Sequence, residues 1–320
     1  MDESCNIKIP VVFVVGSTAS GKSAWALHLA KKYNGIIINA DSVQFYKGLE
    51  IGSASPTRAE KAQVPHRLYN YIDAPAEMTA GQFVRDFYKE LKEFSLSEEM
   101  RPLFVVGGTG FYLQSLEKGM YDVPEVPIEL KQQIELEINQ QGAEMAYQEL
   151  IEFDPQTQVH PHDAYRIGRA LEIKRAFGKK MSELQSEYKS SMKNSLQNPF
   201  LKIGIWNEKE VLLEKVQRRT KIMLQNGMIE EVKTFMEKGF TNWAPLSSVG
   251  YYDVKQMLEG QLASDQLESK IITSTMQLIK KQKTWFKRDP SILWSDGKKQ
   301  KNLQVEGVLD QFLSEHKTQN

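Results

Sequence analysis

The chain of 320 residues is 41% hydrophobic and 26% charged, an ordinary globular composition that allows a sizeable core and either two domains or one domain with an insertion. Basic and acidic side chains both number 41, so no bulk field draws the chain toward nucleic acid, and any such partner would be met by local basic faces. Without a bilayer-length apolar run or a basic signal-peptide start, the sequence predicts a cytoplasmic protein with no membrane association. The lone Cys5 excludes an internal disulfide framework and a cysteine-rich zinc module.

A valine-rich run over residues 11–15, without polar alternation, is typical of a strand buried on both faces of a parallel sheet. The turn that follows fits G-x-x-x-x-G-K-[ST], whose backbone N–H groups curl around a phosphate. Its residues are Gly16, Ser17, Thr18, Ala19, Ser20, Gly21, Lys22 and Ser23. The lysine would neutralise the phosphate, the Ser23 hydroxyl could hold Mg²⁺, and a helix starting at Lys22 would add its positive dipole end. We therefore predict a site for a nucleotide or another diphosphate.

A second strand is predicted over residues 36–38, after a helix over residues 22–33. It would deliver Asn39-Ala40-Asp41-Ser42 to the carboxyl edge of the sheet, where ligands bind in open α/β folds. Asp41 would then lie beside the phosphate loop, as a catalytic carboxylate, a helix cap or a water-mediated ligand of Mg²⁺. Residues 43–80 are interrupted by glycine and proline, which indicates long active-site loops.

A third buried strand is predicted over residues 103–106, after a helix over residues 80–94 with Thr79 as its cap. The strand leads into Gly107-Gly108-Thr109-Gly110 and carries no aspartate at its end. In phosphate-loop proteins that hydrolyse ATP, an acid at such a position usually holds Mg²⁺. Its absence disfavours a motor or switch ATPase.

Residues 121–198 read as a helical insertion between a first part of the core, residues 1–120, and a second part, residues 199–320. Helices are expected over residues 128–141, 143–153 and 163–178, the third with Asp163 as its N-cap. That helix sets Arg166 and Arg169 on one face, which suits a solvated charged surface or contact with RNA phosphates equally. His160 and His162 precede it without the further ligands that zinc would need.

The second part of the core begins with a strand over residues 201–205, followed by helices that break at Gly227. The last long helix, over residues 265–288, places Lys280, Lys283 and Lys287 on one stripe beside aromatic residues, a pattern that suits single-stranded RNA, although Phe286 fits a core position better. The tail after residue 298 is expected to be partly ordered at most. The predicted fold is α/β: a P-loop NTPase-like parallel sheet flanked by helices, with a helical insertion domain.

Together these motifs resemble the tRNA dimethylallyltransferases, also called tRNA isopentenyltransferases, over most of the chain. Besides the phosphate loop, the matching segments are residues 39–52, 64–67, 106–113, 163–171, 223–232 and 249–251. The phosphate loop combined with Asn-Ala-Asp-Ser is highly specific. The chain resembles the shorter bacterial form, because one cysteine cannot build the C-terminal zinc finger of eukaryotic members.

The resemblance implies transfer of the dimethylallyl group from dimethylallyl diphosphate to the exocyclic N6 amine of adenosine-37, the adenosine 3′ of the anticodon in tRNA, with release of diphosphate. Mg²⁺, Lys22, Ser23 and Arg219 would hold the diphosphate, although Lys215 and Arg218 are close alternatives to Arg219. Asp41 would take the proton of the amine, and Thr18 would line the channel for the flipped base together with Thr109.

The tRNA anticodon stem-loop is the implied macromolecular partner, and the chain is expected to act as a monomer. The expected tRNA contacts, with the lysine stripe added from its own pattern, are Asp41, Ser42, Val43, Gln44, Thr109, Arg166, Ile167, Gly168, Arg169, Ala170, Lys280, Lys283 and Lys287. The helical insertion would therefore serve tRNA. The sequence leaves open whether ATP also binds.

Several positions depart from the family's usual residues. Ser17 replaces a common proline, Ser23 a threonine, Ser55 a lysine and Ser247 an arginine, and Gln114 occupies a position that is often basic. The serine at position 23 keeps the hydroxyl. Each missing basic side chain removes a phosphate contact, so tRNA affinity should be weaker or shifted toward the lysine stripe.

Two other functions remain as alternatives. A small-molecule kinase also combines a phosphate loop with an acid on the second strand, and it would transfer a phosphoryl group from ATP. A nucleotide-responsive RNA-binding protein would need no chemistry. Changing Asp41 to asparagine separates that alternative from an enzyme, since only an enzyme would lose turnover.

Overall fold

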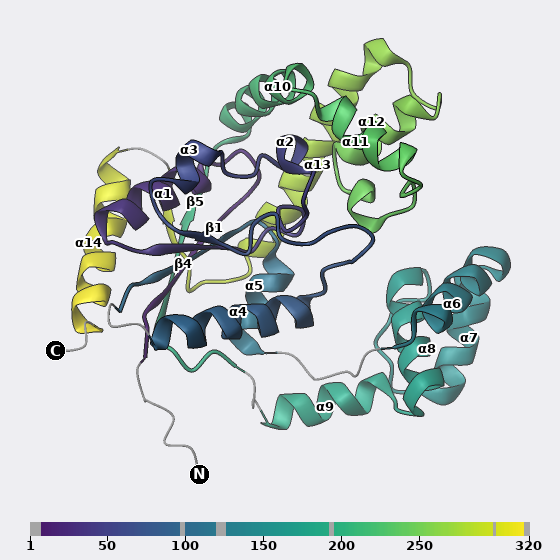
Figure 1. Cartoon of the computed structure of the whole chain (residues 1–320). Helices are drawn as coiled ribbons and strands as arrows, with labels where there is room; N and C mark the ends of the chain where they lie inside the picture. The colour runs from purple at the N-terminus through teal and green to yellow at the C-terminus, as the bar shows by residue number, and fades with distance from the viewer. Residues whose placement is uncertain (1–7, 97–99, 120–125, 192–194, 297–298, 317–320) are drawn as a thin grey trace. The chain divides into compact units, whose positions relative to one another are not determined.

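The computed structural model describes residues 8–96, 100–119, 126–191, 195–296 and 299–316 (Figure 1). The chain divides into two compact units, one made of Met1–Ser115 and Gln197–Asn320 and the other of Leu116–Leu196. The predicted start of the insertion at residue 121 lies outside the described residues, as does Cys5.

The first unit is built on a parallel sheet with the strand order β3-β2-β4-β1-β5-β6. Its strands are β1 (Val11–Gly16), β2 (Ile36–Asn39), β3 (His66–Arg67), β4 (Leu103–Gly107), β5 (Phe200–Ile205) and β6 (Leu293–Ser295). Val14 of β1 pairs with Val106 on one side and Ile203 on the other, so the strand that leads into the phosphate loop is central. The four apolar runs that predicted strands are confirmed, whereas the short edge strands β3 and β6 were not predicted.

Helices surround this sheet (Figure 1). They are α1 (Lys22–Lys32), α2 (Glu50–Ser53), α3 (Arg58–Lys61), α4 (Ala80–Ser95), α5 (Gly110–Lys118), α10 (Lys209–Gln225), α11 (Met228–Glu237), α12 (Tyr251–Leu258), α13 (Leu267–Phe286) and α14 (Lys299–Glu315), with 3₁₀ turns at Ala244–Ser247 and Ser264–Gln266. α4 begins where the sequence predicts, because the Thr79 hydroxyl accepts a hydrogen bond from the Gln82 amide.

The central strand is buried on both faces, as its unbroken valines predict. Val12 and Val14 pack with Leu29 of α1 and Leu309 of α14 in one hydrophobic cluster. On the other face, the Phe13 ring lies edge-on to Phe200 with the ring centroids 5.7 Å apart. Packing on both faces of the sheet fixes the position of the end of β1, and therefore the start of the loop that follows it.

The C-terminal helix α14 gives regular structure to residues 299–315 of the tail that the sequence predicts to be partly ordered at most, and residues 317–320 lie outside the described residues. Its Glu306 is only 7% exposed and accepts hydrogen bonds from Trp25 Nε1 at 3.4 Å and from Lys32 Nζ at 3.2 Å. Leu309 and Leu313 join the cluster beneath α1. α14 is held in place because its apolar residues and one carboxylate pack on α1, a helix near the start of the chain.

The second unit is helical and contains α6 (Ile128–Gln141), α7 (Ala143–Phe153), α8 (Ala164–Phe177) and α9 (Met181–Ser191). The first two match their predicted bounds, and α8 begins after Asp163, whose carboxylate accepts from the Arg166 amide at 3.1 Å. Ile134, Ile167 and Leu171 form the centre of its own hydrophobic cluster. Within the described residues of both units, no helix is long and apolar enough to span a bilayer.

Candidate active site

The carboxyl ends of four neighbouring strands meet at one edge of the sheet. β1 leads into the phosphate loop, β2 into Asp41, β4 into Thr109 and β5 into Asn207. Since the strands are parallel, their following loops lie on the same side. The structure therefore brings together segments that are far apart in the chain.

The phosphate loop has the backbone of an anion cradle. A Cβ at Gly16 would lie 2.8 Å from the Ser20 hydroxyl oxygen and 3.1 Å from the Ile205 carbonyl oxygen, so only glycine fits there. Ala19 and Gly21 have left-handed backbones, with φ angles of 61° and 99°. Alternating left-handed residues turn successive N–H groups toward one side, and Gly21 ends the loop at the positive end of α1.

Two cations and one carboxylate form an electrostatic group at this loop. Burial lowers the pKa of Lys22 to about 8; the negative charge of Asp41 opposes this shift and the positive charge of Arg219 adds to it. Burial also lowers the pKa of Arg219, again opposed by Asp41. Two partly buried positive charges and a single carboxylate leave an excess of positive charge at the loop. A bound diphosphate would neutralise this excess.

Helix α10 distinguishes between the three basic side chains that the sequence left as alternatives. Arg219 is half-buried and its Nη2 donates to the Ser53 carbonyl at 3.3 Å. Lys215, one turn earlier on the same face, has its Nζ 3.4 Å from the Ser20 carbonyl oxygen. Arg218 is exposed. Arg219 and Lys215 therefore reach the loops of the site.

Asp41 is held by a local turn. Its amide donates to Asn39 Oδ1 at 2.8 Å, and its Oδ1 accepts from the Val43 amide at 3.1 Å. The next residue, Ser42, donates its amide to Thr109 Oγ1 at 3.1 Å. The next helix, α2, begins only at Glu50, so Asp41 forms a turn and does not cap a helix.

Glu231 and Tyr251 anchor α2 beside the site. The carboxylate of Glu231 accepts from the amides of Ile51 at 2.6 Å and Gly52 at 3.0 Å, and lies 2.9 Å from the Tyr251 hydroxyl. That hydroxyl accepts from the Ser53 amide at 3.0 Å. Burial raises the pKa of Glu231, although these hydrogen bonds oppose the shift. These contacts hold Ser53, whose carbonyl accepts the hydrogen bond from Arg219. The sequence analysis assigned no role to Glu231 or Tyr251.

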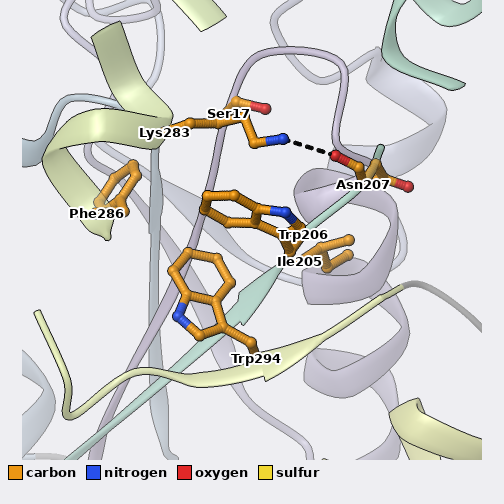
Figure 2. A pocket seen from close by; sticks show the side chains of 7 residues that line it. All are labelled: Ser17, Ile205, Trp206, Asn207, Lys283, Phe286 and Trp294. Carbon is orange, nitrogen blue, oxygen red and sulfur yellow. Dashed lines mark hydrogen bonds between the residues drawn. The ribbon is translucent and has the colours of Figure 1, made fainter. Parts of the chain in front are cut away.

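A pocket opens beside the phosphate loop (Figure 2). Its lining residues are Ser17, Ile205, Trp206, Asn207, Lys283, Phe286 and Trp294. Lys283 Nζ donates to the Asn207 carbonyl at 2.9 Å, the bond that is dashed in Figure 2. The same atom lies 4.2 Å from the centroid of the Trp206 ring. Lys283 is thus turned toward Asn207, which lies just after the end of β5, whereas Lys280 and Lys287 of the predicted stripe are exposed. Phe286 is buried, as predicted.

The predicted tRNA residues on α8 divide into two kinds. Ile167, Gly168 and Ala170 are buried within the helical unit, so these residues are not displayed on its surface. The side chain of Arg166 is 70% exposed beside Asp163. Arg169 forms an ion pair with Glu172 at 2.5 Å. The arginines are the members of this set that a polyanion could contact.

Two polar residues at the site were missed by sequence reasoning. Asn207 donates its side-chain amide to the Ser20 carbonyl at 3.0 Å, and its place directly after β5 was a signal that could have identified it. Gln282 of α13 accepts from the Thr18 amide at 2.8 Å. It stands among lysines, and no local pattern marks it.

The chain is similar to known proteins in sequence and in fold. The family model described as IPP transferase matches residues 44–289. A tRNA dimethylallyltransferase of Bdellovibrio bacteriovorus is 47% identical over 306 residues, covering 95% of this chain and 98% of that protein. The full-length tRNA isopentenylpyrophosphate transferase from Bacillus halodurans is 26% identical, with a TM-score of 0.68 and coverage of 97% and 98% of the two chains.

A eukaryotic dimethylallyltransferase acting on tRNA shares the fold, with a TM-score of 0.78 at 24% identity over 96% of this chain and 80% of that one. The fold class is therefore confirmed. Since the family model covers more than half of the chain and the bacterial relative aligns over nearly its whole length, the chain belongs to the IPP transferase family.

Proposed function

We propose that this protein is a tRNA dimethylallyltransferase, which moves the dimethylallyl group of dimethylallyl diphosphate to the N6 amine of adenosine-37 in tRNA and releases diphosphate. The observation that carries the proposal is the meeting of the phosphate loop with Lys22, Arg219 and Asp41 at one sheet edge. The 47% identical relative bears the name of this activity.

The cations would act on the leaving group. As the carbon–oxygen bond of the substrate breaks, negative charge grows on the diphosphate while the allyl group becomes cation-like. Positive groups already aimed at that charge stabilise the transition state at no cost of reorganisation. Lys22 and Arg219, whose pKa values are both lowered by burial, would fill this role. β4 ends in Gly107 and supplies no acid for phosphoryl chemistry.

Mg²⁺ would share this task. Ser23 lies in the first turn of α1, where its hydroxyl is available as an oxygen ligand. Among the described residues there is no group of three histidine, cysteine or acidic side chains able to hold a metal ion. Mg²⁺ keeps several waters and commonly binds through substrate phosphates, so a single hydroxyl with diphosphate oxygens is a fitting donor set. When bound, the ion would neutralise charge on the diphosphate.

Asp41 would act as the general base. The exocyclic amine of adenosine is a weak nucleophile, and it must lose a proton as the new carbon–nitrogen bond forms. With Oδ1 held by the Val43 amide, Oδ2 is the proposed proton acceptor. The flipped adenine would enter between Thr18 of the loop after β1 and Thr109 of the loop after β4, whose hydroxyl oxygen accepts from the amide of Ser42, the neighbour of Asp41.

The tRNA would be held mainly through its backbone. The candidate cations are Arg166 and Arg169 of α8 and the exposed Lys280 and Lys287 of α13. The turn at residues 41–44 would contact the anticodon loop beside the reacting base. Phosphate contacts of this kind release counterions, so binding should weaken steeply as salt rises. We propose that one monomer carries the complete site.

The direct test incubates the protein with unmodified tRNA, Mg²⁺ and labelled dimethylallyl diphosphate, followed by digestion to nucleosides. Label should appear on adenosine-37. Asp41→Asn should lower turnover about 10²- to 10⁴-fold, the usual contribution of a general base, with little change in tRNA affinity. Label absent from adenosine would refute the proposal, and transfer of the γ-phosphoryl group of ATP would point to a kinase instead.

A further inference from the structure

One side chain of α13 connects two loops of the candidate site. Gln282 Oε1 accepts a hydrogen bond from the Thr18 amide at 2.8 Å, and Gln282 Nε2 donates to the Gly108 carbonyl at 3.1 Å. Thr18 belongs to the phosphate loop after β1, and Gly108 to the loop after β4. Both ends of one amide are thus used to join the two loops.

The glycines after β4 are shaped to receive this helix. A Cβ at Gly108 would lie 2.6 Å from Gln282 Nε2 and 3.3 Å from the Gly16 carbonyl oxygen. A Cβ at Gly110 would overlap the indole of Trp285, one turn further along α13. The sequence pattern Gly-Gly-Thr-Gly therefore makes room for side chains of a distant helix.

The same loop continues to the proposed general base. Thr109 follows Gly108, and its hydroxyl oxygen accepts from the amide of Ser42, the neighbour of Asp41. A chain of contacts thus runs from the phosphate loop through Gln282 and the β4 loop to the turn that carries Asp41. The phosphate loop and Asp41 follow different strands, and Gln282 joins the phosphate loop to the β4 loop, which in turn contacts the neighbour of Asp41.

We propose that Gln282 is a positioning residue, which sets the separation between the diphosphate cradle and Asp41 without touching either reacting group. The proposal rests on the proposed function. A neutral amide suits the task because it donates and accepts at once, whereas a glutamate would place an acceptor against the Gly108 carbonyl. Asparagine is one methylene shorter and cannot reach both loops.

The first test compares Gln282→Met, Gln282→Glu and Gln282→Asn with the wild-type protein. A displacement of about 1 Å in a reacting group can cost about a hundredfold in rate. We expect kcat to fall about 10- to 100-fold in each variant, while the KM for dimethylallyl diphosphate and the affinity for inorganic pyrophosphate stay within about threefold. Gln277→Ala, at an exposed position of the same helix, is the matched control and should behave as wild type.

A kcat of Gln282→Met within twofold of wild type would overturn the positioning role. So would parallel losses of thermal stability, pyrophosphate affinity and kcat, since that pattern indicates a purely structural contact. A wild-type protein that transfers no dimethylallyl group would refute the proposed function and this role with it. An active wild type with an unaffected Gln282→Met would refute the positioning role alone.

The second test asks whether Gln282 acts through Gly108. Gly108→Ala should displace the amide and lower kcat to a similar degree, because its methyl group would enter the space of Gln282 Nε2. If the two residues work as one link, Gln282→Ala combined with Gly108→Ala should lower kcat no further than the stronger single variant. Losses that multiply in the double variant would contradict the link.

Discussion

Lys22 should make binding of the diphosphate sensitive to alkaline pH well below the range of an ordinary lysine. Burial in the phosphate loop lowers its pKa to about 8, an effect that Arg219 reinforces and Asp41 partly offsets. Below pH 8 the ammonium is charged and ready to bind an anion. Above pH 8 the free protein loses this charge, and binding must take up a proton.

The magnitude follows from this pKa. Each pH unit above 8 should weaken binding about tenfold, because a proton must be restored at a cost of about 1.4 kcal/mol per unit. Between pH 7 and pH 10 the affinity should therefore fall about a hundredfold. A solvent-exposed lysine, with a pKa of about 10.4, would leave the affinity almost constant over most of this interval.

The assay is calorimetric titration with the non-transferable analogue dimethylallyl thiodiphosphate, at constant salt, from pH 6.5 to pH 10. Lys22→Arg is the control, since a guanidinium stays charged throughout this range. The affinity of this variant should not decrease as the pH rises above 8. A wild-type affinity that stays flat to pH 9.5, or a bend that survives in Lys22→Arg, would refute the electrostatic reasoning.

Three further substitutions test contacts within the two units. Glu231→Gln should lower the free energy of unfolding in urea by about 2–4 kcal/mol, because an amide cannot accept from every donor that the buried carboxylate satisfies; an unchanged midpoint would contradict the clamp on α2. Glu306→Ala should cost about 1–3 kcal/mol by leaving Trp25 Nε1 without its acceptor, and the loss should appear in thermal melts while pyrophosphate affinity stays at the wild-type value. Leu171→Ala should cost about 2–5 kcal/mol within the helical unit, so hydrogen exchange should rise over α6 to α8, and faster exchange in the sheet would argue against two separate cores.

The phosphate loop and the position of Asp41 could be predicted because the information for them is local in the sequence. A run of valines followed by G-x-x-x-x-G-K-S specifies a buried strand, an anion cradle and a helix start within a few residues. The next strand ends two residues before Asp41, and parallel strands end at a common edge. Lys22 and Asp41 could therefore be placed together without coordinates.

The residues that hold the loops of the site together could be identified only from the tertiary structure. The hydrogen bond from Thr18 to Gln282 joins residues 264 positions apart, and that from Gln282 to Gly108 spans 174. No periodicity shows which polar residue of a long helix will face a loop, so Gln282 was overlooked and Lys283 was grouped with Lys280 and Lys287 on one stripe. The order of α14 likewise comes from burying Glu306 against α1, a contact that its own sequence does not reveal.

The amino-acid sequence by itself determined the central strand, the phosphate loop, Asp41 and the family, because each is encoded in a short contiguous pattern. Only the tertiary structure decided which cations are desolvated, which side chains brace the loops and where the tail docks. These properties arise from distant segments packing together, since burial and hydrogen-bond geometry are set by the neighbours that folding brings into contact.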